Sequence, residues 1–222
     1  MTVNETVQGW VYLLLELAVL PYLLVPLGKF FPPESAAAWV NTIYYVINFV
    51  CCGLIFRRFL GQNLALAGKK PLELLASSMM GFVLHMAGSF LLGYVIELLA
   101  PGFSNVNDAA ILEMARGNFE LMAVGVVLLV PLTEECLFRG LLFQGLHRKS
   151  RALAYAVSVL GFCALHIVGY IGVYPAETLL ICYLQYVPAG LSLAWAYERA
   201  DSIFAPILIH AAVNAASFFA LR

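Results

Sequence analysis

Seven runs of apolar residues follow one another along the chain, separated by short polar or proline-containing segments. The runs are continuous, whereas the strands of a membrane β-barrel alternate apolar and polar residues over about ten positions. Most runs reach the roughly 20 residues that a helix needs to cross the hydrocarbon core. The pattern therefore predicts an all-α, polytopic transmembrane bundle of about seven helices. Their expected ranges are 9–28, 36–56, 71–99, 118–146, 152–172, 176–197 and 202–221.

The connections between these runs leave no room for a soluble domain. Pro21 and Pro26 interrupt the first run, because proline lacks a backbone donor and disrupts a helix. The longest connection, 100–117, is long enough for a short interfacial helix. Residues 1–222 are therefore predicted to form a single integral membrane domain.

The composition identifies lipid as the solvent of this chain. Hydrophobic residues make up 63% of the sequence and charged residues 11%, with a mean hydropathy of +0.90. Soluble domains contain about 45–50% apolar and about 25% charged residues. The net charge of −1, without a basic patch, gives no indication of nucleic-acid binding. The lipid bilayer is thus the partner that the composition predicts, and the oligomeric state is not encoded in it.

The basic residues are distributed unevenly between the two sets of connections, which predicts an orientation. One set carries Arg57, Arg58, Lys69, Lys70, Arg148, Lys149, Arg151 and Arg199, and the other carries Lys29, Arg116 and Arg222. Because basic connections favour the cytoplasmic side, we expect the N-terminus inside and the C-terminus outside.

Three ionisable residues lie inside the fourth apolar run, in VVLLVPLTEECLFRGLLFQGL. Charges at such depth are costly, so a functional role is the default expectation. Glu135 precedes Arg139 by four residues, so the two share a helical face and can form an ion pair. Glu134 points about 100° away from Glu135 around the helix axis. A histidine from another helix beside Glu134 would allow this carboxylate to act as a general base. Pro131 cannot donate to the carbonyl of Val127, so a bend is expected just before the pair.

Two later helices supply neutral polar residues at a similar depth. His166 lies in the fifth run, and His210 and Asn214 lie four residues apart on one face of the seventh. Both residues of the seventh run can donate hydrogen bonds without a charge, which suits an oxyanion. Glu134, His166 and Asn214 each lie roughly 18–20 Å from the cytoplasmic end of their helix, at about 1.5 Å per residue. This agreement favours one common site.

Other interpretations stay open at this point. The same residues could form a structural ion cluster or interhelical hydrogen bonds, and Glu134, His166 and His210 could together ligate zinc. Other classes of intramembrane protease fit less well, because the sequence has no His-Glu-x-x-His, no Gly-x-Ser-Gly and no aspartate inside a predicted membrane helix.

Three motifs together resemble the CPBP family, which includes type II CAAX prenyl endopeptidases, bacteriocin-processing or immunity proteins and abortive-infection proteins. The resemblance spans residues 131–214. The motifs are Glu-Glu-x-x-x-Arg (Glu134, Glu135, Arg139), Phe-x-x-x-His (Phe162, His166) and His-x-x-x-Asn (His210, Asn214).

The resemblance implies a metal-independent glutamate-type endopeptidase without a cofactor. It would hydrolyse a peptide bond of a membrane-associated peptide or protein, with or without a lipid. Glu134 would activate water with the help of His166, and His210 and Asn214 would form the oxyanion hole. The supporting residues would be Glu135, Arg139 and Phe162. The alternative expectation is a non-catalytic immunity or scaffold protein in which this cluster is structural.

The resemblance also makes 118–222 the expected catalytic core, reached from the cytoplasm, in what is expected by analogy to be a prokaryotic plasma membrane. Glu16 and His85, in the first and third runs, are expected to have structural roles, and a position facing the cavity or near the interface stays open for Glu16. The second run carries a polar stripe that is expected to pack inward, with a wall of a substrate groove as the alternative. The stripe consists of Asn41, Tyr44, Tyr45 and Asn48.

Overall fold

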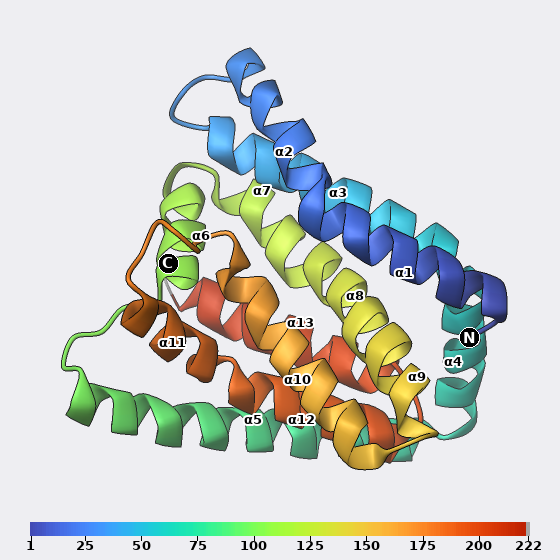
Figure 1. Cartoon of the computed structure of the whole chain (residues 1–222). Helices are drawn as coiled ribbons and strands as arrows, with labels where there is room; N and C mark the ends of the chain where they lie inside the picture. The colour runs from blue at the N-terminus through green and yellow to red at the C-terminus, as the bar shows by residue number, and fades with distance from the viewer. Residues whose placement is uncertain (221–222) are drawn as a thin grey trace.

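The computed structural model describes residues 1–220, and these residues form helices joined by short connections (Figure 1). The all-α bundle predicted from the sequence is therefore confirmed. Residue 221, the expected end of the seventh run, and Arg222 lie outside the described residues. The elements are α1 (Val3–Ala18), α2 (Leu20–Leu24), η1 (Val25–Phe30), α3 (Ala36–Ile55), α4 (Arg57–Lys69), α5 (Pro71–Leu99), α6 (Val106–Gly117), α7 (Phe119–Val124), η2 (Gly125–Leu129), α8 (Val130–Glu135), η3 (Cys136–Phe143), α9 (Gln144–His147), α10 (Arg151–Val168), α11 (Ala176–Gln185), α12 (Val187–Ala200) and α13 (Phe204–Phe219).

Most of the predicted runs are long and apolar enough to cross a membrane. Within residues 1–220, five helical segments meet this condition, namely Ala36–Ile55, Pro71–Leu99, Phe119–His147, Arg151–Val168 and Ala176–Ala200. Val3–Ala18 and Leu20–Phe30 form a sixth span if the two helices are counted as one crossing. They meet at a bend of 54°, close to the predicted proline break. The seventh run, α13, is apolar but has only 16 residues. It is shorter than the roughly 20 residues of a full crossing.

The fourth run is a continuous helix with two widened π-helical stretches. The first, η2, ends just before Pro131, where the missing proline donor was expected to perturb the helix. The second, η3, begins directly after Glu135, and all of its residues are buried. Widened turns of this kind are frequent at functional sites. Glu134 and Glu135 thus lie on a short α-helical stretch between two π-helical stretches.

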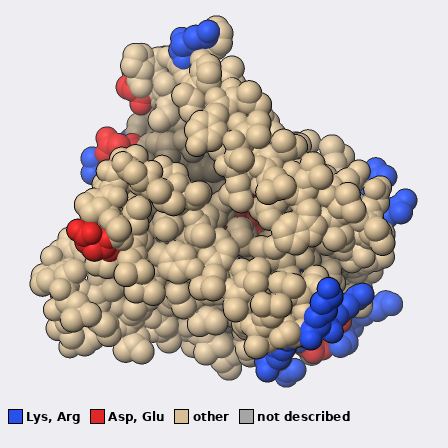
Figure 2. Space-filling view, in the orientation of Figure 1, with Lys and Arg blue, Asp and Glu red and all other residues tan. Residues whose placement is uncertain are grey.

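One end of the bundle gathers the N-terminus and the basic connections. Asn63 of α4 accepts a hydrogen bond from the backbone of Ile203, directly before α13 (2.8 Å). Arg151, at the start of α10, donates two hydrogen bonds to Glu198 near the end of α12 (2.7 and 2.8 Å). This end lies to the right in Figure 1, and Figure 2 shows Lys and Arg gathered there. The segment of α4 was expected to be a connection, and its helix is a difference from the prediction.

The short helix expected in the longest connection is present as α6, at the opposite end of the bundle (Figure 1). The side chain of Asn105 caps it by accepting from the backbone N–H groups of Asn107 and Asp108. The Asn105 amide also donates to Gln185 at the end of α11 (2.8 Å). These bonds hold α6 against the junction of α11 and α12.

The longest helix, α5, packs along α12 and α13 and leaves its other face bare. Gly81 permits the close approach, because a Cβ atom there would lie 2.5 Å from Ile209 and 3.0 Å from Ala196. On the bare face Leu72 and Phe90 are 81% and 80% exposed. Large apolar side chains exposed along a whole helix indicate a lipid-facing surface.

Candidate active site

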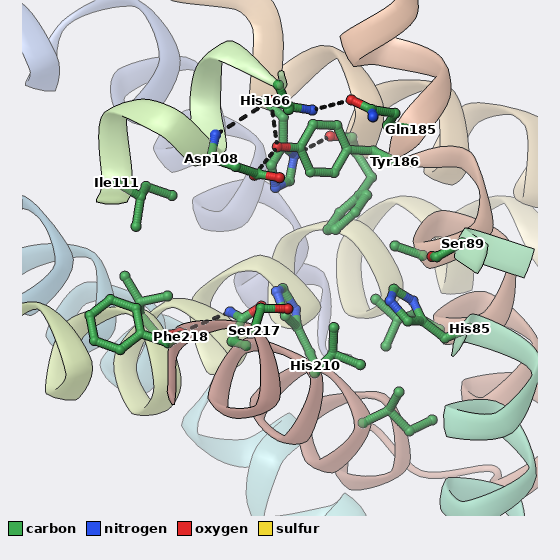
Figure 3. Close-up of a pocket in the computed structure, with 18 of the residues that line it drawn as sticks. His85, Ser89, Asp108, Ile111, His166, Gln185, Tyr186, His210, Ser217 and Phe218 are labelled. Carbon is green, nitrogen blue, oxygen red and sulfur yellow. Dashed lines mark hydrogen bonds between the residues drawn. The ribbon is translucent and has the colours of Figure 1, made fainter. Parts of the chain in front are cut away.

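The helices that carry the three motifs converge around one cavity. Glu134 of α8, His166 of α10, and His210 and Asn214 of α13 line a space of about 260 Å³. The same histidines and Asn214 also line a neighbouring cavity of about 440 Å³. Figure 3 shows His166 and His210 reaching this larger cavity from opposite sides. The four residues singled out in the sequence as catalytic candidates are therefore neighbours in space.

The Glu134 carboxylate faces two imidazole rings. Its Oε2 atom lies 4.0 Å from Nε2 of His166 and 3.9 Å from Nε2 of His210. These distances are too long for direct hydrogen bonds, and Oε2 has no hydrogen-bond partner within residues 1–220. Contacts of this length between polar groups are suited to bridging by a water molecule or a substrate atom.

His166 presents a hydrogen-bond acceptor to Glu134 when its ring is neutral. Its Nδ1 atom lies 2.9 Å from the backbone carbonyl of Phe162. A carbonyl only accepts, so Nδ1 carries the hydrogen and Nε2 keeps a lone pair. Tyr186 stacks on the ring at a centroid distance of 4.0 Å and restrains its rotation.

The ion pair predicted from helical spacing is present and fully buried. Arg139 donates to Oε1 of Glu135 (3.0 Å) and to the carbonyl of Gly190 (3.1 Å), and neither charged side chain of the pair is exposed. Nδ1 of His210 lies 2.9 Å from the same Glu135 oxygen. Because Glu135 is held as a carboxylate by Arg139, Nδ1 of His210 must carry the hydrogen.

This contact changes what His210 can donate into the cavity. A neutral ring whose only hydrogen is on Nδ1 turns a lone pair toward Glu134. The sequence suggested that His210 donates to an oxyanion without a charge. With Nδ1 bound to Glu135, His210 donates from Nε2 only as an imidazolium.

Asn214 keeps one donor free. Its amide nitrogen donates to the carbonyl of Val126 in η2 (2.9 Å), which uses one of its two hydrogens. The second hydrogen remains for a group in the cavity. The widened turn of η2 therefore takes part in orienting a residue of α13.

The ring of Phe162 packs against the buried Arg139 guanidinium and against the rings of both histidines. The Arg139 guanidinium lies 4.5 Å from the centre of its ring, a cation–π contact. The ring packs against His166 at 4.7 Å and edge-on against His210 at 5.9 Å between centroids. The side chain thus separates the ion pair from the cavity while contacting both rings.

Several residues without an assigned role also reach the two cavities. Tyr186 donates to Asp108 of α6 (2.8 Å) and accepts from Asn107 (3.1 Å), which places α6 over the site. Asp108 belongs to the connection 100–117, in which the sequence indicated no functional residue. His85 lines the larger cavity, with an Nδ1 that has no partner within residues 1–220, and Glu16 lines the smaller one.

Both cavities lie toward the end of the bundle that carries α6. Asp108 lines each of them, whereas none of the basic residues of the connections does. The sequence predicted a cytoplasmic basic end and a cavity open to the cytoplasm. The basic connections and α6 lie at opposite ends (Figure 1), and the cytoplasmic basic end and the cytoplasmic opening both stay predictions.

Glu134, His166 and His210 were also considered as zinc ligands. Within residues 1–220 no group of three or more His, Cys, Asp or Glu side chains is arranged so that it could hold a metal ion. The described side chains therefore give no support to this alternative.

Comparison with known proteins agrees with the motifs. Residues 116–216 match the family model of the type II CAAX prenyl endopeptidase Rce1-like proteins, a region that includes all three motifs. No curated protein and no solved structure gives a significant match.

Proposed function

We propose that this chain, whose residues 116–216 match the family model of the Rce1-like type II CAAX prenyl endopeptidases, is a glutamate-type intramembrane endopeptidase that needs no metal. Its substrate is a membrane-associated peptide or protein, with or without a lipid. The observation that carries the proposal is the Glu134 Oε2 atom, unpartnered within residues 1–220 and facing Nε2 of His166 and of His210 at 4.0 and 3.9 Å. A poised carboxylate of this kind suits general-base catalysis.

Glu134 and His166 would hold the attacking water between them. Both present acceptors, so the water donates one hydrogen to Glu134 Oε2 and the other to His166 Nε2. Its lone pair is then directed at the carbonyl carbon of the substrate. Glu134 takes the proton as the new C–O bond forms, and it returns a proton to the leaving nitrogen as the C–N bond breaks.

His210 and Asn214 would stabilise the negative charge on the carbonyl oxygen. Asn214 contributes the amide hydrogen that Val126 does not use. His210 contributes Nε2–H as an imidazolium, whose charge Glu135 stabilises from the other side of the ring. Loss of one such donor typically lowers kcat by about 10²–10³-fold.

The orientation in the membrane is a separate part of the proposal. The basic connections favour a cytoplasmic N-terminus, and the cavity beside α6 then faces the opposite compartment. Membrane-impermeant maleimide labelling of Asp108→Cys and Arg148→Cys in intact cells tests this orientation. We expect labelling of Asp108→Cys alone, and labelling of Arg148→Cys alone would reverse the orientation.

The enzymatic proposal is tested with purified protein in detergent and a peptide library read by mass spectrometry. Glu134→Gln and His166→Ala are expected to lower kcat by about 10²–10⁴-fold without a loss of melting temperature. Glu120→Gln, an exposed carboxylate on the same continuous helix, is the matched control and keeps full activity.

Three outcomes would contradict the proposal. Full activity of Glu134→Gln would exclude Glu134 as the base, and activity lost with 1,10-phenanthroline would favour the zinc site. If the wild-type protein cleaves no peptide of the library, the non-catalytic immunity or scaffold role becomes the better interpretation.

A further inference from the structure

One buried carboxylate in the cavity has no part in the proposed mechanism. Glu16 of α1 is 3% exposed and lines the cavity of about 260 Å³ together with Glu134. It lies outside residues 116–216, so the family match does not account for it. An ionisable residue inside an apolar span is costly unless it is paired or used.

Glu16 is poorly satisfied by the surrounding protein. Its Oε1 atom accepts a long hydrogen bond from the hydroxyl of Tyr44 (3.4 Å), and Oε2 has no partner within residues 1–220. Oε2 of Glu135 also has no hydrogen-bond partner within residues 1–220, but its Oε1 accepts from both Arg139 and His210, and Arg139 balances its charge. Among the described residues no Lys, Arg or His forms an ion pair with Glu16.

The wall around Glu16 is rich in acceptors, and the groups on it that can carry a positive charge are the imidazoles of His166 and His210, which face Glu134. Besides Glu16, the carboxylates of Asp108 and Glu134 line the cavity, and no Lys or Arg lines it. The polar stripe of the second run, which was expected to pack inward, forms part of the same wall. It contributes Asn41, Tyr44, Tyr45 and Asn48.

We propose that Glu16 and the α3 stripe form a subsite for a basic side chain, lysine or arginine, of the peptide substrate. An ammonium or guanidinium group supplies the hydrogens that Oε2 of Glu16 lacks, in a charge-assisted hydrogen bond. The methylene stem of such a side chain packs against apolar lining residues such as Ile111 and Val130. The assignment of this basic side chain to a peptide substrate rests on the proposed function.

The size of the cavity limits where the basic residue stands in the substrate. Glu16 and the proposed base Glu134 line one space of about 260 Å³. The basic side chain therefore belongs to a residue close to the scissile bond. A cation there also offsets the repulsion between Glu16 and Glu134.

The test compares peptide pairs that differ only by lysine or norleucine at each position near the cleaved bond. Wild-type protein is expected to cleave the lysine peptide with at least tenfold higher kcat/KM at one position. Glu16→Gln, which keeps the shape and removes the charge, is expected to abolish this difference between the two peptides. Glu16→Asp keeps the charge and is expected to retain part of it.

A binding measurement separates this inference from the proposed function. Fluorescence anisotropy with the Glu134→Gln protein in detergent measures the affinity of each labelled peptide without cleavage. At least tenfold tighter binding of the lysine peptide, lost in the Glu16→Gln, Glu134→Gln double variant, supports the subsite even if no cleavage occurs. Equal affinities for the lysine and norleucine peptides at all positions would overturn it, whether or not the protein is a protease.

Discussion

Nδ1 of His210 lies 2.9 Å from Oε1 of Glu135, the oxygen that also accepts a hydrogen bond from Arg139. Oε1 of Glu135 therefore contacts Arg139, four residues further along the same continuous helix, and His210 of α13, which is 75 positions away in the sequence. The contact determines which nitrogen of His210 carries the hydrogen, and through it the chemistry that His210 offers to the cavity. Replacing Glu135 thus affects both stability and the proposed catalysis.

Glu135→Gln is expected to reduce the yield of folded protein and its melting temperature, because it leaves the buried Arg139 without a counter-ion. Breaking a buried pair in this way costs about 3–5 kcal/mol. The matched control is Glu113→Gln, which breaks a pair with Arg116 whose side chains are 72% and 74% exposed. Exposed pairs contribute only about 0–1 kcal/mol. Equal melting temperatures of the two variants would count against the importance of the buried pair.

Asn214→Ala is expected to lower kcat by about 10²–10³-fold with little change in KM, because it removes a donor that acts in the transition state. Ser217→Ala serves as the control, since Ser217 lies on the same helix and lines the larger cavity. Steady-state kinetics with a cleaved library peptide measure both effects. A rise in KM at constant kcat would instead assign Asn214 to substrate binding.

Tyr186→Phe is expected to loosen α6 while preserving the ring that stacks on His166. The variant loses the hydrogen bonds to Asp108 and Asn107, and a hydrogen bond of this kind contributes about 0.5–1.5 kcal/mol. Hydrogen exchange of the α6 amides should therefore become faster than in the wild-type protein. Tyr183→Phe is the control, because the Tyr183 hydroxyl donates to Leu160 on α10 and not to α6. Unchanged exchange in Tyr186→Phe would show that other contacts hold α6 in place.

Gly81→Ala is expected to destabilise the packing of α5 against α12 and α13. The added Cβ would lie 2.5 Å from Ile209 and 3.0 Å from Ala196, and overpacking of this kind costs about 1–3 kcal/mol. Gly53→Ala is the control, because its Cβ would meet no atom within 4 Å. Alanine is also the better helix former by up to about 1 kcal/mol. Melting curves in detergent should thus show opposite shifts for the two variants, and a shared direction would contradict the close approach at Gly81.

Several features of this protein follow from local pattern and composition alone. Continuous apolar runs predicted the helical membrane bundle, and the spacing of Glu135 and Arg139 predicted their ion pair. The common depth of Glu134, His166 and Asn214 predicted that they meet. These inferences succeed because helix length, helical spacing and depth follow from the position of a residue along its own helix.

The choice of neighbouring helices, and the rotation of each helix about its axis, became known from the packing of the folded chain. Those rotations determine the bond from His210 to Glu135, the end of the bundle that holds the cavity, and the position of Glu16 beside Glu134, with an Oε2 that has no partner within residues 1–220. In lipid the outer and the buried faces of a helix are both apolar, so hydropathy does not indicate which face turns inward. The apolar character of both faces made the membrane helices easy to recognise in the sequence. For the same reason the sequence does not indicate how these helices pack against one another.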